Sequence, residues 1–375
     1  MKRHTIYVLL ALVSTACSTQ THKSQQESVT EPTPRLEILV GTYTGQGSEG
    51  IYSIQFDPAT GAISDKQLVA TTTSPSYLAL SPDKQRVYAV NEGGEGNVTA
   101  YQWNDSHTQL DLINSQSSQG LYPCYVSLQD SLVAIANYGG GNVVSYPLDA
   151  AGALSDNPVN QQHEGTGPNS DRQEAPHAHC AVFSKDGQYL YGVDLGIDQI
   201  RMYSVADLTA EGEVALQLDA GDGPRHLTFH PNKDIAFVIS ELSSTVTTAS
   251  IDPLTGKMTA LSKVSTLPEG HEGDNSCADI HVSDDGRYLY ASNRGHNSIA
   301  IFSIDPETSA LKMIATESVM GDWPRNFTLS PDNNYILVAN KKSNNITVFK
   351  RDKETGMMYY TDQQLEISQP VCLKF

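Results

Sequence analysis

The fold is decided by a hairpin motif that recurs along the chain. Its clearest copies are Tyr77-Leu-Ala-Leu-Ser-Pro-Asp-Lys-Gln-Arg-Val-Tyr-Ala-Val-Asn91 and Cys180-Ala-Val-Phe-Ser-Lys-Asp-Gly-Gln-Tyr-Leu-Tyr-Gly-Val-Asp194. Each copy predicts a short strand, a turn containing Asp, and a second strand rich in aromatic and aliphatic residues. Further copies span residues 125–137, 226–240, 279–293 and 326–340, so the six copies lie roughly fifty residues apart.

A second motif is a tight turn of the Asp-Pro-x-Thr-Gly type, which follows later strands at residues 57–61, 252–256, 305–309 and 352–356. Pro and Gly in such turns suit a close connection between antiparallel strands. Four short strands per repeat, without a helical linker, are typical of a propeller blade.

The two ends of the chain indicate how the ring closes. Residues 36–56 resemble the second and third strands of a blade that lacks its first strand, whereas residues 369–375 match the first-strand segment 323–329. We therefore expect an all-β, seven-bladed β-propeller in which the C-terminal strand pairs with the N-terminal strands of one blade. Tandem β-sandwiches are the alternative, but they need neither a regular repeat nor a split terminal unit.

Composition and charge narrow the class of partner. The chain has 375 residues, of which 39% are hydrophobic and 18% charged, so it can bury a large core. Its 43 acidic and 24 basic side chains give a formal charge of −19, which argues against nucleic acid or an anionic lipid surface as a main partner. An anionic small molecule would need a local cationic pocket. We expect a monomer.

The first residues have the order of a targeting signal. Residues 2–4 are basic, residues 6–13 form an apolar run of eight, and residues 14–16 are small and precede Cys17. The apolar run is too short to span a bilayer. A cysteine in this place is typical of a bacterial lipoprotein, in which it is lipidated. Ser14 departs from the Leu usual at its position, which leaves simple secretion open.

These features divide the chain into three parts. We expect a signal or lipoprotein segment at residues 1–17, a flexible tether at residues 18–35 that is rich in Ser, Thr, Gln, Glu and Pro, and the propeller at residues 36–375. The predicted location is the cell envelope or periplasm, with membrane contact only through a lipid on Cys17.

The other cysteines do not have the spacing of a zinc site. They are Cys124, Cys180, Cys277 and Cys372. An oxidising compartment would allow disulfides, but we expect buried free thiols.

The repeat predicts which side chains meet at the axis, because the innermost strand of each blade lines the central channel and ligands commonly bind at one mouth of it. A first ring comes from the start of each innermost strand: Ser76, Cys124, His179, Arg225, Ala278, Arg325 and Val371. A second ring follows the end of the next strand: Tyr43, Glu92, Tyr138, Leu195, Glu241, Arg294 and Lys341.

The arginines of these rings predict an anionic ligand. Arg225, Arg294 and Arg325 each carry a planar fork of donors that suits a carboxylate or phosphate. Each arginine alone is as easily explained by a bond to a neighbouring carbonyl group. Three of them in one ring are better explained by ligand binding.

Histidines and carboxylates complete the candidate site. His179 titrates near neutral pH and is able to take a proton from water. Glu241 is able to orient that histidine, to neutralise an arginine, or to act as acid or base. His177 and Asp279 widen the polar set as candidate substrate-binding residues. The sequence has no metal-binding spacing, no phosphate-cradling loop before a helix and no serine nucleophile elbow, so we expect no cofactor.

With these motifs the sequence resembles the lactonase family of seven-bladed β-propellers, which includes propeller-type 6-phosphogluconolactonase and carboxy-muconate cyclase. The resemblance covers about residues 36–375 and is most specific at residues 177–179, 223–232, 241–246, 278–281, 285–290 and 323–325. It implies that His179, Arg225, Glu241 and Arg294 or Arg325 belong to the active site.

The resemblance implies hydrolysis of a sugar-derived lactone to the open-chain acid. His179 and Glu241 would serve as acid–base residues, and the arginines would bind the anionic group or the oxyanion. Because the chain has an export signal, we expect a lactone outside the inner membrane as substrate. A lipid-anchored binding or scaffold propeller without turnover is the alternative, although the intact His179, Arg225 and Glu241 favour catalysis.

Overall fold

A computed structural model describes residues 1–2, 4–10 and 34–375. The predicted lipidation at Cys17 and most of the predicted tether lie outside the described residues and stay predictions. Residues 34–375 fold as one unit. Within the described part of the chain, no helix is long and apolar enough to cross a membrane.

The strands form seven four-stranded sheets, which we number as blades and give from the innermost strand outward. Blade 1 contains β28 (Pro370–Lys374), β1 (Leu36–Thr42), β2 (Gly50–Phe56) and β3 (Ile63–Thr71). Blade 2 contains β4 (Pro75–Leu80), β5 (Arg86–Asn91), β6 (Asn97–Trp103) and β7 (Leu110–Ser117). Blade 3 contains β8 (Pro123–Gln129), β9 (Leu132–Asn137), β10 (Asn142–Pro147) and β11 (Val159–Gln162).

The other four blades have the same order. Blade 4 contains β12 (Ala178–Phe183), β13 (Tyr189–Asp194), β14 (Gln199–Ser204) and β15 (Glu213–Gln217). Blade 5 contains β16 (Pro224–Phe229), β17 (Ile235–Ser240), β18 (Thr245–Ile251) and β19 (Met258–Ser265). Blade 6 contains β20 (Ser276–Val282), β21 (Tyr288–Arg294), β22 (Ser298–Ile304) and β23 (Leu311–Ser318). Blade 7 contains β24 (Pro324–Leu329), β25 (Tyr335–Asn340), β26 (Asn345–Arg351) and β27 (Met358–Glu366).

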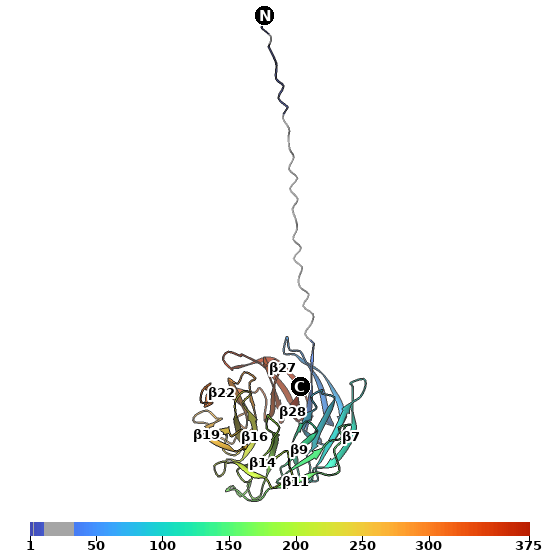
Figure 1. Cartoon of the computed structure of the whole chain (residues 1–375), viewed down its shortest axis with the longest axis vertical. Helices are drawn as coiled ribbons and strands as arrows, with labels where there is room; N and C mark the ends of the chain where they lie inside the picture. The colour runs from blue at the N-terminus through green and yellow to red at the C-terminus, as the bar shows by residue number, and fades with distance from the viewer. Residues whose placement is uncertain (3, 11–33) are drawn as a thin grey trace. The chain divides into compact units, whose positions relative to one another are not determined.

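The innermost strands close a ring around the axis. Each contacts the innermost strand of the next blade, and β28 contacts both β24 and β4. The last strand pairs antiparallel with the first, Val40 opposite Leu373 and Gly41 opposite Cys372 (Figure 1). The predicted all-β, seven-bladed propeller, closed through its two termini, is confirmed.

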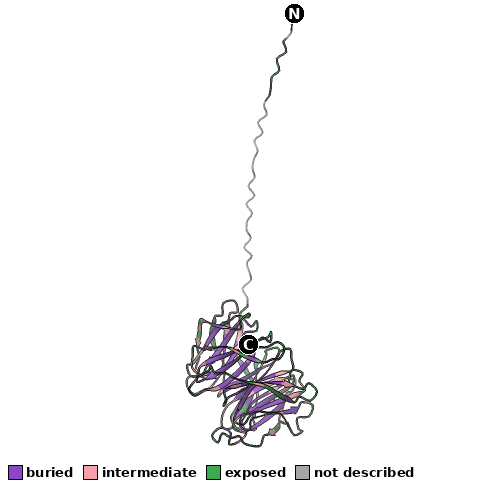
Figure 2. Ribbon diagram, turned by 90° about the vertical axis from the view of Figure 1, so that its left-hand side faces the viewer, coloured by how far each residue is buried: buried purple, intermediate pink, exposed green. Residues whose placement is uncertain are grey.

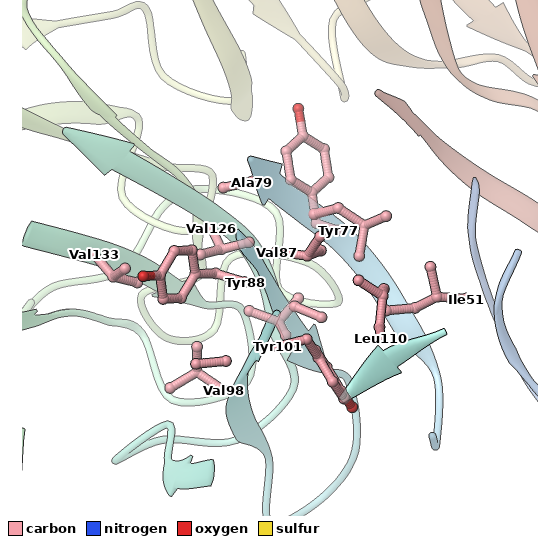
Figure 3. Close-up of a cluster of buried hydrophobic side chains, with 14 of the residues drawn as sticks. Ile51, Tyr77, Ala79, Val87, Tyr88, Val98, Tyr101, Leu110, Val126 and Val133 are labelled. Atoms are coloured by element: carbon pink, nitrogen blue, oxygen red, sulfur yellow. The ribbon is translucent and has the colours of Figure 1, made fainter. Parts of the chain in front are cut away.

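The hydrophobic core lies between neighbouring blades. The second strand of a blade is buried on both faces, whereas the outermost strands β7, β19 and β27 are exposed or partly exposed after their first residue. Figure 2 shows the buried strands inside and the more exposed ones at the surface. In the cluster drawn in Figure 3, Val87 and Val98 of blade 2 pack with Val126 and Val133 of blade 3. Strands that are covered on both faces read as continuous apolar runs, which explains the aliphatic second strand of the motif.

The predicted tight turns connect the third and fourth strands of blades 1, 5, 6 and 7. In the first, the Asp57 carboxylate accepts the Ala59 N–H at 2.8 Å and the Asp57 carbonyl accepts the Gly61 N–H at 2.7 Å. Gly61 has φ of +76°, the left-handed region that glycine adopts most easily. The described cysteines are all buried free thiols, as expected.

Ring closure predicts a specific effect of shortening Leu373. This side chain is 1% exposed and packs in a cluster with Leu337 and Val348 of blade 7. We expect Leu373→Ala to lower the free energy of unfolding by about 2–5 kcal/mol, because a buried Leu leaves a cavity. Leu261→Ala, on the outer strand β19 with 52% exposure, should change it by less than about 0.5 kcal/mol. Urea unfolding measures both, and equal effects would contradict this account of closure.

Candidate active site at the channel mouth

Every innermost strand carries an irregularity at its first-ring position. In β16, Pro224 pairs with Ser240 and His226 pairs with Ile239, so Arg225 between them is an extra residue. The same shift occurs at Ser76, Cys124, His179, Ala278 with Asp279, Arg325 and Val371. Such bulges re-aim a side chain away from the regular alternation of a strand. The first ring is therefore a ring of bulges.

The second ring is tied to the first through the backbone. The Glu241 N–H donates to the Gly223 carbonyl at 2.7 Å, and the Lys341 N–H donates to the Trp323 carbonyl at 3.0 Å. Tyr43, Glu92, Tyr138 and Leu195 make the equivalent bond in their blades. Each bond places a second-ring residue beside the start of an innermost strand, so the two rings lie together.

Glu241 is the shared partner of three guanidinium groups. Its Oε2 lies 2.7 Å from Arg294 Nη2 and 3.0 Å from Arg225 Nε, and its Oε1 lies 2.7 Å from Arg172 Nη2. Burial raises the pKa of Glu241, but Arg294, Arg225 and Arg172 outweigh that effect and hold the pKa far below its usual value. Glu241 is therefore a carboxylate at neutral pH, and proton transfer by it is disfavoured.

Arg225 and Arg294 are also fixed by backbone carbonyl groups. Arg225 Nη1 donates to Ala278 O at 2.6 Å, and Arg294 Nη2 donates to Cys277 O at 2.7 Å. Burial, together with the charges of Arg294 and Arg325, lowers the pKa of Arg225 to about 10. Arg225 therefore lies close to two other guanidinium groups, and an anionic ligand beside it would offset their mutual repulsion.

Arg172 is a member of the site that the repeat did not predict. It lies in the connection of fifteen residues between β11 and β12, residues 163–177, which we call the strap; the other six connections between blades have ten residues or fewer. Buried Gln173 fastens the strap by donating to the Leu195 carbonyl and to Asp198, each at 2.8 Å. The only sequence signal for Arg172 is the unusual length of this connection.

A second cationic group lies at blades 1 and 7. Tyr43 donates to Glu92 Oε2 at 2.7 Å, and Arg325 Nη2 lies 3.8 Å from the same oxygen. Arg325 and Lys341 lie over the Tyr43 ring, at 5.4 and 4.8 Å from its centroid. Burial, followed by the charge of Arg325, lowers the pKa of Lys341. The repeat predicted these positions but indicated no role for Tyr43, Glu92 or Lys341.

Trp323 holds further cations at the mouth. Lys342 Nζ lies 3.5 Å and the Arg294 guanidinium carbon 5.4 Å from the Trp323 ring. Aromatic faces attract cations without neutralising them. In the site built so far, six cationic side chains face two carboxylates: Arg172, Arg225, Arg294, Arg325, Lys341 and Lys342 against Glu92 and Glu241.

His179 lies among aromatic rings beside this cluster. Its ring is 5.6 Å from Tyr138 and 5.5 Å from His226, and its Nδ1 is 3.7 Å from Cys124 Sγ. Burial, then the charge of Arg225, holds the pKa of His179 well below its usual value, so the imidazole is neutral at pH 7. Its Nε2 makes no hydrogen bond with a described residue. His179 is therefore placed to accept a proton.

Aromatic side chains from opposite sides of the ring meet beneath the site. Tyr77 and Tyr125 stack at 4.1 Å, and their rings lie 5.9 and 5.2 Å from that of His226. Blades 2 and 3 thus contact blade 5 across the axis. We call the rings of Tyr77, Tyr125 and His226 the floor. The charged cluster adjoins the floor through Arg225, whose Nη1 lies 3.2 Å from His226 Nε2.

Two predicted substrate-binding residues have other partners. His177 Nδ1 lies 2.8 Å from the Tyr138 carbonyl and His177 Nε2 3.2 Å from Glu174. The Asp279 carboxylate contacts His226 and His281 at 2.8 and 3.0 Å. The geometry therefore argues against direct substrate contact by Asp279, because blade-packing groups occupy both of its oxygens. Among the described residues, no cluster of His, Cys, Asp or Glu is arranged to hold a metal ion.

Glu241→Gln should destabilise the protein in a pH-dependent way. At pH 7 it leaves three buried or half-buried guanidinium groups without their carboxylate, so we expect a loss of about 3–5 kcal/mol in the free energy of unfolding. Because the pKa of Glu241 is depressed in the folded protein, the difference in the free energy of unfolding between wild type and Glu241→Gln should be fully present above a pH of about 4.5, the ordinary pKa of Glu. The difference should shrink as the pH falls below that value.

Unfolding titrations of both proteins at several pH values measure this difference. Glu213→Gln is the control, because Glu213 pairs with Lys257 at 2.5 Å on the exposed outer side of the sheet and should matter little. A pH-independent difference between wild type and Glu241→Gln would contradict the ion cluster.

Comparisons with known proteins identify the family of the chain. The chain matches the family described as Lactonase, 7-bladed beta-propeller, over residues 37–375. It is 37% identical over 341 residues to 6-phosphogluconolactonase of Bacillus subtilis, which covers 90% of this chain and 97% of the relative. It is 33% identical over 307 residues to 6-phosphogluconolactonase of Formosa agariphila, with 78% and 86% covered.

A solved structure has the same fold. The periplasmic gluconolactonase PpgL of Pseudomonas aeruginosa is 33% identical and superimposes with a TM-score of 0.86, covering 91% of this chain and 99% of that chain. The family predicted from sequence motifs is confirmed. The relatives support lactone hydrolysis in general as the activity. This chain belongs to the lactonase family of seven-bladed β-propellers and is a 6-phosphogluconolactonase-like hydrolase.

Proposed function

We propose that the chain hydrolyses a sugar-derived lactone to its open-chain hydroxy acid at the channel mouth. The observation that supports this most is the meeting of a neutral imidazole, His179, with three guanidinium groups that share the Glu241 carboxylate. A lactone is a cyclic ester, so its hydrolysis needs an activated water molecule and a stabilised oxyanion.

His179 acts as the general base. It takes a proton from water while the water oxygen bonds to the carbonyl carbon, and the carbonyl π electrons move onto the oxygen. When this tetrahedral intermediate collapses, the bond to the ring oxygen breaks and the proton on His179 passes to that oxygen. One lactone and one water give one hydroxy acid, and the imidazole is neutral again.

Arg225 and Arg294 stabilise the oxyanion. Arg225 Nη2 makes no hydrogen bond with a described residue, although its Nη1 and Nε are engaged. A donor held in place before the reaction stabilises developing charge without reorganisation. Arg325 binds another anionic or polar group of the substrate from the blade 7 side.

Glu241 serves as the counter-ion that holds the arginines in contact. Its depressed pKa keeps it ionised, so it sets the charge of the cluster. Acid–base catalysis by Glu241 is the alternative interpretation from the sequence. It is less well supported, because three guanidinium groups lower the pKa of Glu241 and make it a weak base.

The names of the relatives and the predicted export signal bear on both the substrate class and the location of the enzyme in the cell. The relatives are named for phosphorylated and unphosphorylated gluconolactone, and the Pseudomonas aeruginosa protein is named periplasmic. With the signal predicted at residues 1–17, these names support an exported enzyme that acts on an aldonolactone in the cell envelope, anchored through Cys17. The predictions that it is a monomer and needs no cofactor stand as part of this proposal.

His179→Gln should slow lactone hydrolysis by about 10²–10⁴-fold, because glutamine does not accept a proton from water. Arg225→Ala should lower the rate of lactone hydrolysis by about 10²–10³-fold, because the oxyanion loses a hydrogen-bond donor. A pH-indicator assay over aldonolactones, with and without a terminal phosphate, measures acid release against the buffer blank.

His107→Gln is the matched control, since His107 is an exposed histidine paired with Glu37. Wild-type rates no faster than the blank on every lactone would contradict the proposed function. Full activity in His179→Gln would contradict only the assignment of the base.

A further inference from the structure

His226 is the residue of the floor that contacts the charged cluster. Its Nε2 lies 3.2 Å from Arg225 Nη1, and its Nδ1 lies 2.8 Å from Asp279 Oδ1. An ionised carboxylate only accepts hydrogen bonds, so the Nδ1 of His226 must carry the proton. The Nε2 is then an acceptor for Arg225, and the bonds run in one direction from Arg225 through His226 to Asp279.

Asp279 is held firmly in turn. Its Oδ2 accepts from Asn326 Nδ2 at 2.5 Å, from His281 Nε2 at 3.0 Å and from the Phe327 N–H at 3.2 Å. Asp279 and His226 are 2% and 4% exposed. Donors from blades 6 and 7 thus hold the Asp279 carboxylate in place, and Asp279 in turn holds the His226 imidazole.

These contacts set the orientation of the Arg225 guanidinium. Its Nη1 donates to Ala278 O and to His226, and its Nε lies 3.0 Å from Glu241 Oε2. Because the guanidinium is planar, fixing two nitrogens fixes the third. Nε meets the Glu241 carboxylate as an ion pair without forming a hydrogen bond. Nη2 has neither a hydrogen bond nor an ion pair with a described residue, and it is the nitrogen that the proposed function uses.

We infer that His226, held by Asp279, is a positioning residue for lactone hydrolysis that aims Arg225 Nη2 at the oxyanion. The inference rests on the proposed function. It gives Asp279 a role through His226 in place of direct substrate contact. It also requires a neutral His226, since an imidazolium would turn an N–H and a positive charge toward Arg225.

The surroundings of His226 keep it neutral. Burial and the charge of Arg225 lower its pKa to about 4, against the opposing effect of Asp279. The groups that face it from the packed strands are Asp279 of β20, Arg225 of β16, Arg325 of β24, His179 of β12, Tyr125 of β8 and Tyr77 of β4. Acidification below about pH 4 should therefore disrupt the alignment of Arg225.

The pH dependence of hydrolysis tests this role. In the wild type, His179 and His226 must both be neutral, so log(kcat/KM) should fall with a slope approaching about two at the acid end. In His226→Gln the amide accepts from Arg225 and donates to Asp279 at every pH. We expect activity at pH 7 within about tenfold of wild type and an acid slope of about one.

Loss of the His226 Nε2 acceptor should lower kcat rather than raise KM, because the orientation of Arg225 affects the energy of the transition state more than substrate binding. We expect His226→Phe to lose about 10²-fold in kcat with little change in KM. His230→Gln is the control: His230 is equally buried at 4% and follows the same strand at its other end, so it should keep the wild-type slope whatever its effect on stability.

An unchanged acid slope in His226→Gln, or wild-type kcat in His226→Phe, would overturn the inference while leaving the proposed function intact. If His226→Phe does not fold, the slope in His226→Gln decides. A wild-type protein without activity on any lactone would remove the proposed function, and the positioning role with it.

Discussion

The arrangement of the charged site depends on one buried carboxylate, that of Glu241, which pairs with three arginines. Glu241 is shared by Arg225 from an innermost strand, Arg294 from the neighbouring blade and Arg172 from the strap. Positive charges without a counter-ion are costly to bury, and removing the carboxylate would leave Arg225 and Arg294 in that state and the half-buried Arg172 without its ion pair. The backbone N–H of Glu241 donates to the carbonyl of Gly223, two residues before the bulge at Arg225. The fold of the blade therefore sets the position of the negative charge.

The same cluster explains how an acidic chain can bind an anion. The formal charge of −19 belongs to the whole molecule, whereas exposed charges more than about 8 Å away are screened at physiological salt. At the mouth, Tyr43 and Trp323 hold cations through their ring faces. Those contacts gather positive charge without neutralising it, which leaves the cations available to a developing oxyanion.

The repeat predicted the blades, their closure and the residues of both rings, because strand spacing and turn chemistry recur in every blade. It could not predict Arg172, which comes from a connection outside the repeat. It also could not predict the partners of Asp279, since a bulge shifts the alternation of a strand by one residue and so reverses which face the next side chain takes. The partners of Glu241 depend on side-chain reach across blades, which spacing along the chain does not contain.

The central claim is that distant bulged strands build one oxyanion-binding mouth. A crystal structure of the protein soaked with gluconate, the open-chain product of gluconolactone, tests it most directly. The account predicts the carboxylate within hydrogen-bond distance of Arg225 Nη2 and Arg294, with His179 beside it. Gluconate bound on the outer strands, or density absent from the mouth at saturating ligand, would contradict it.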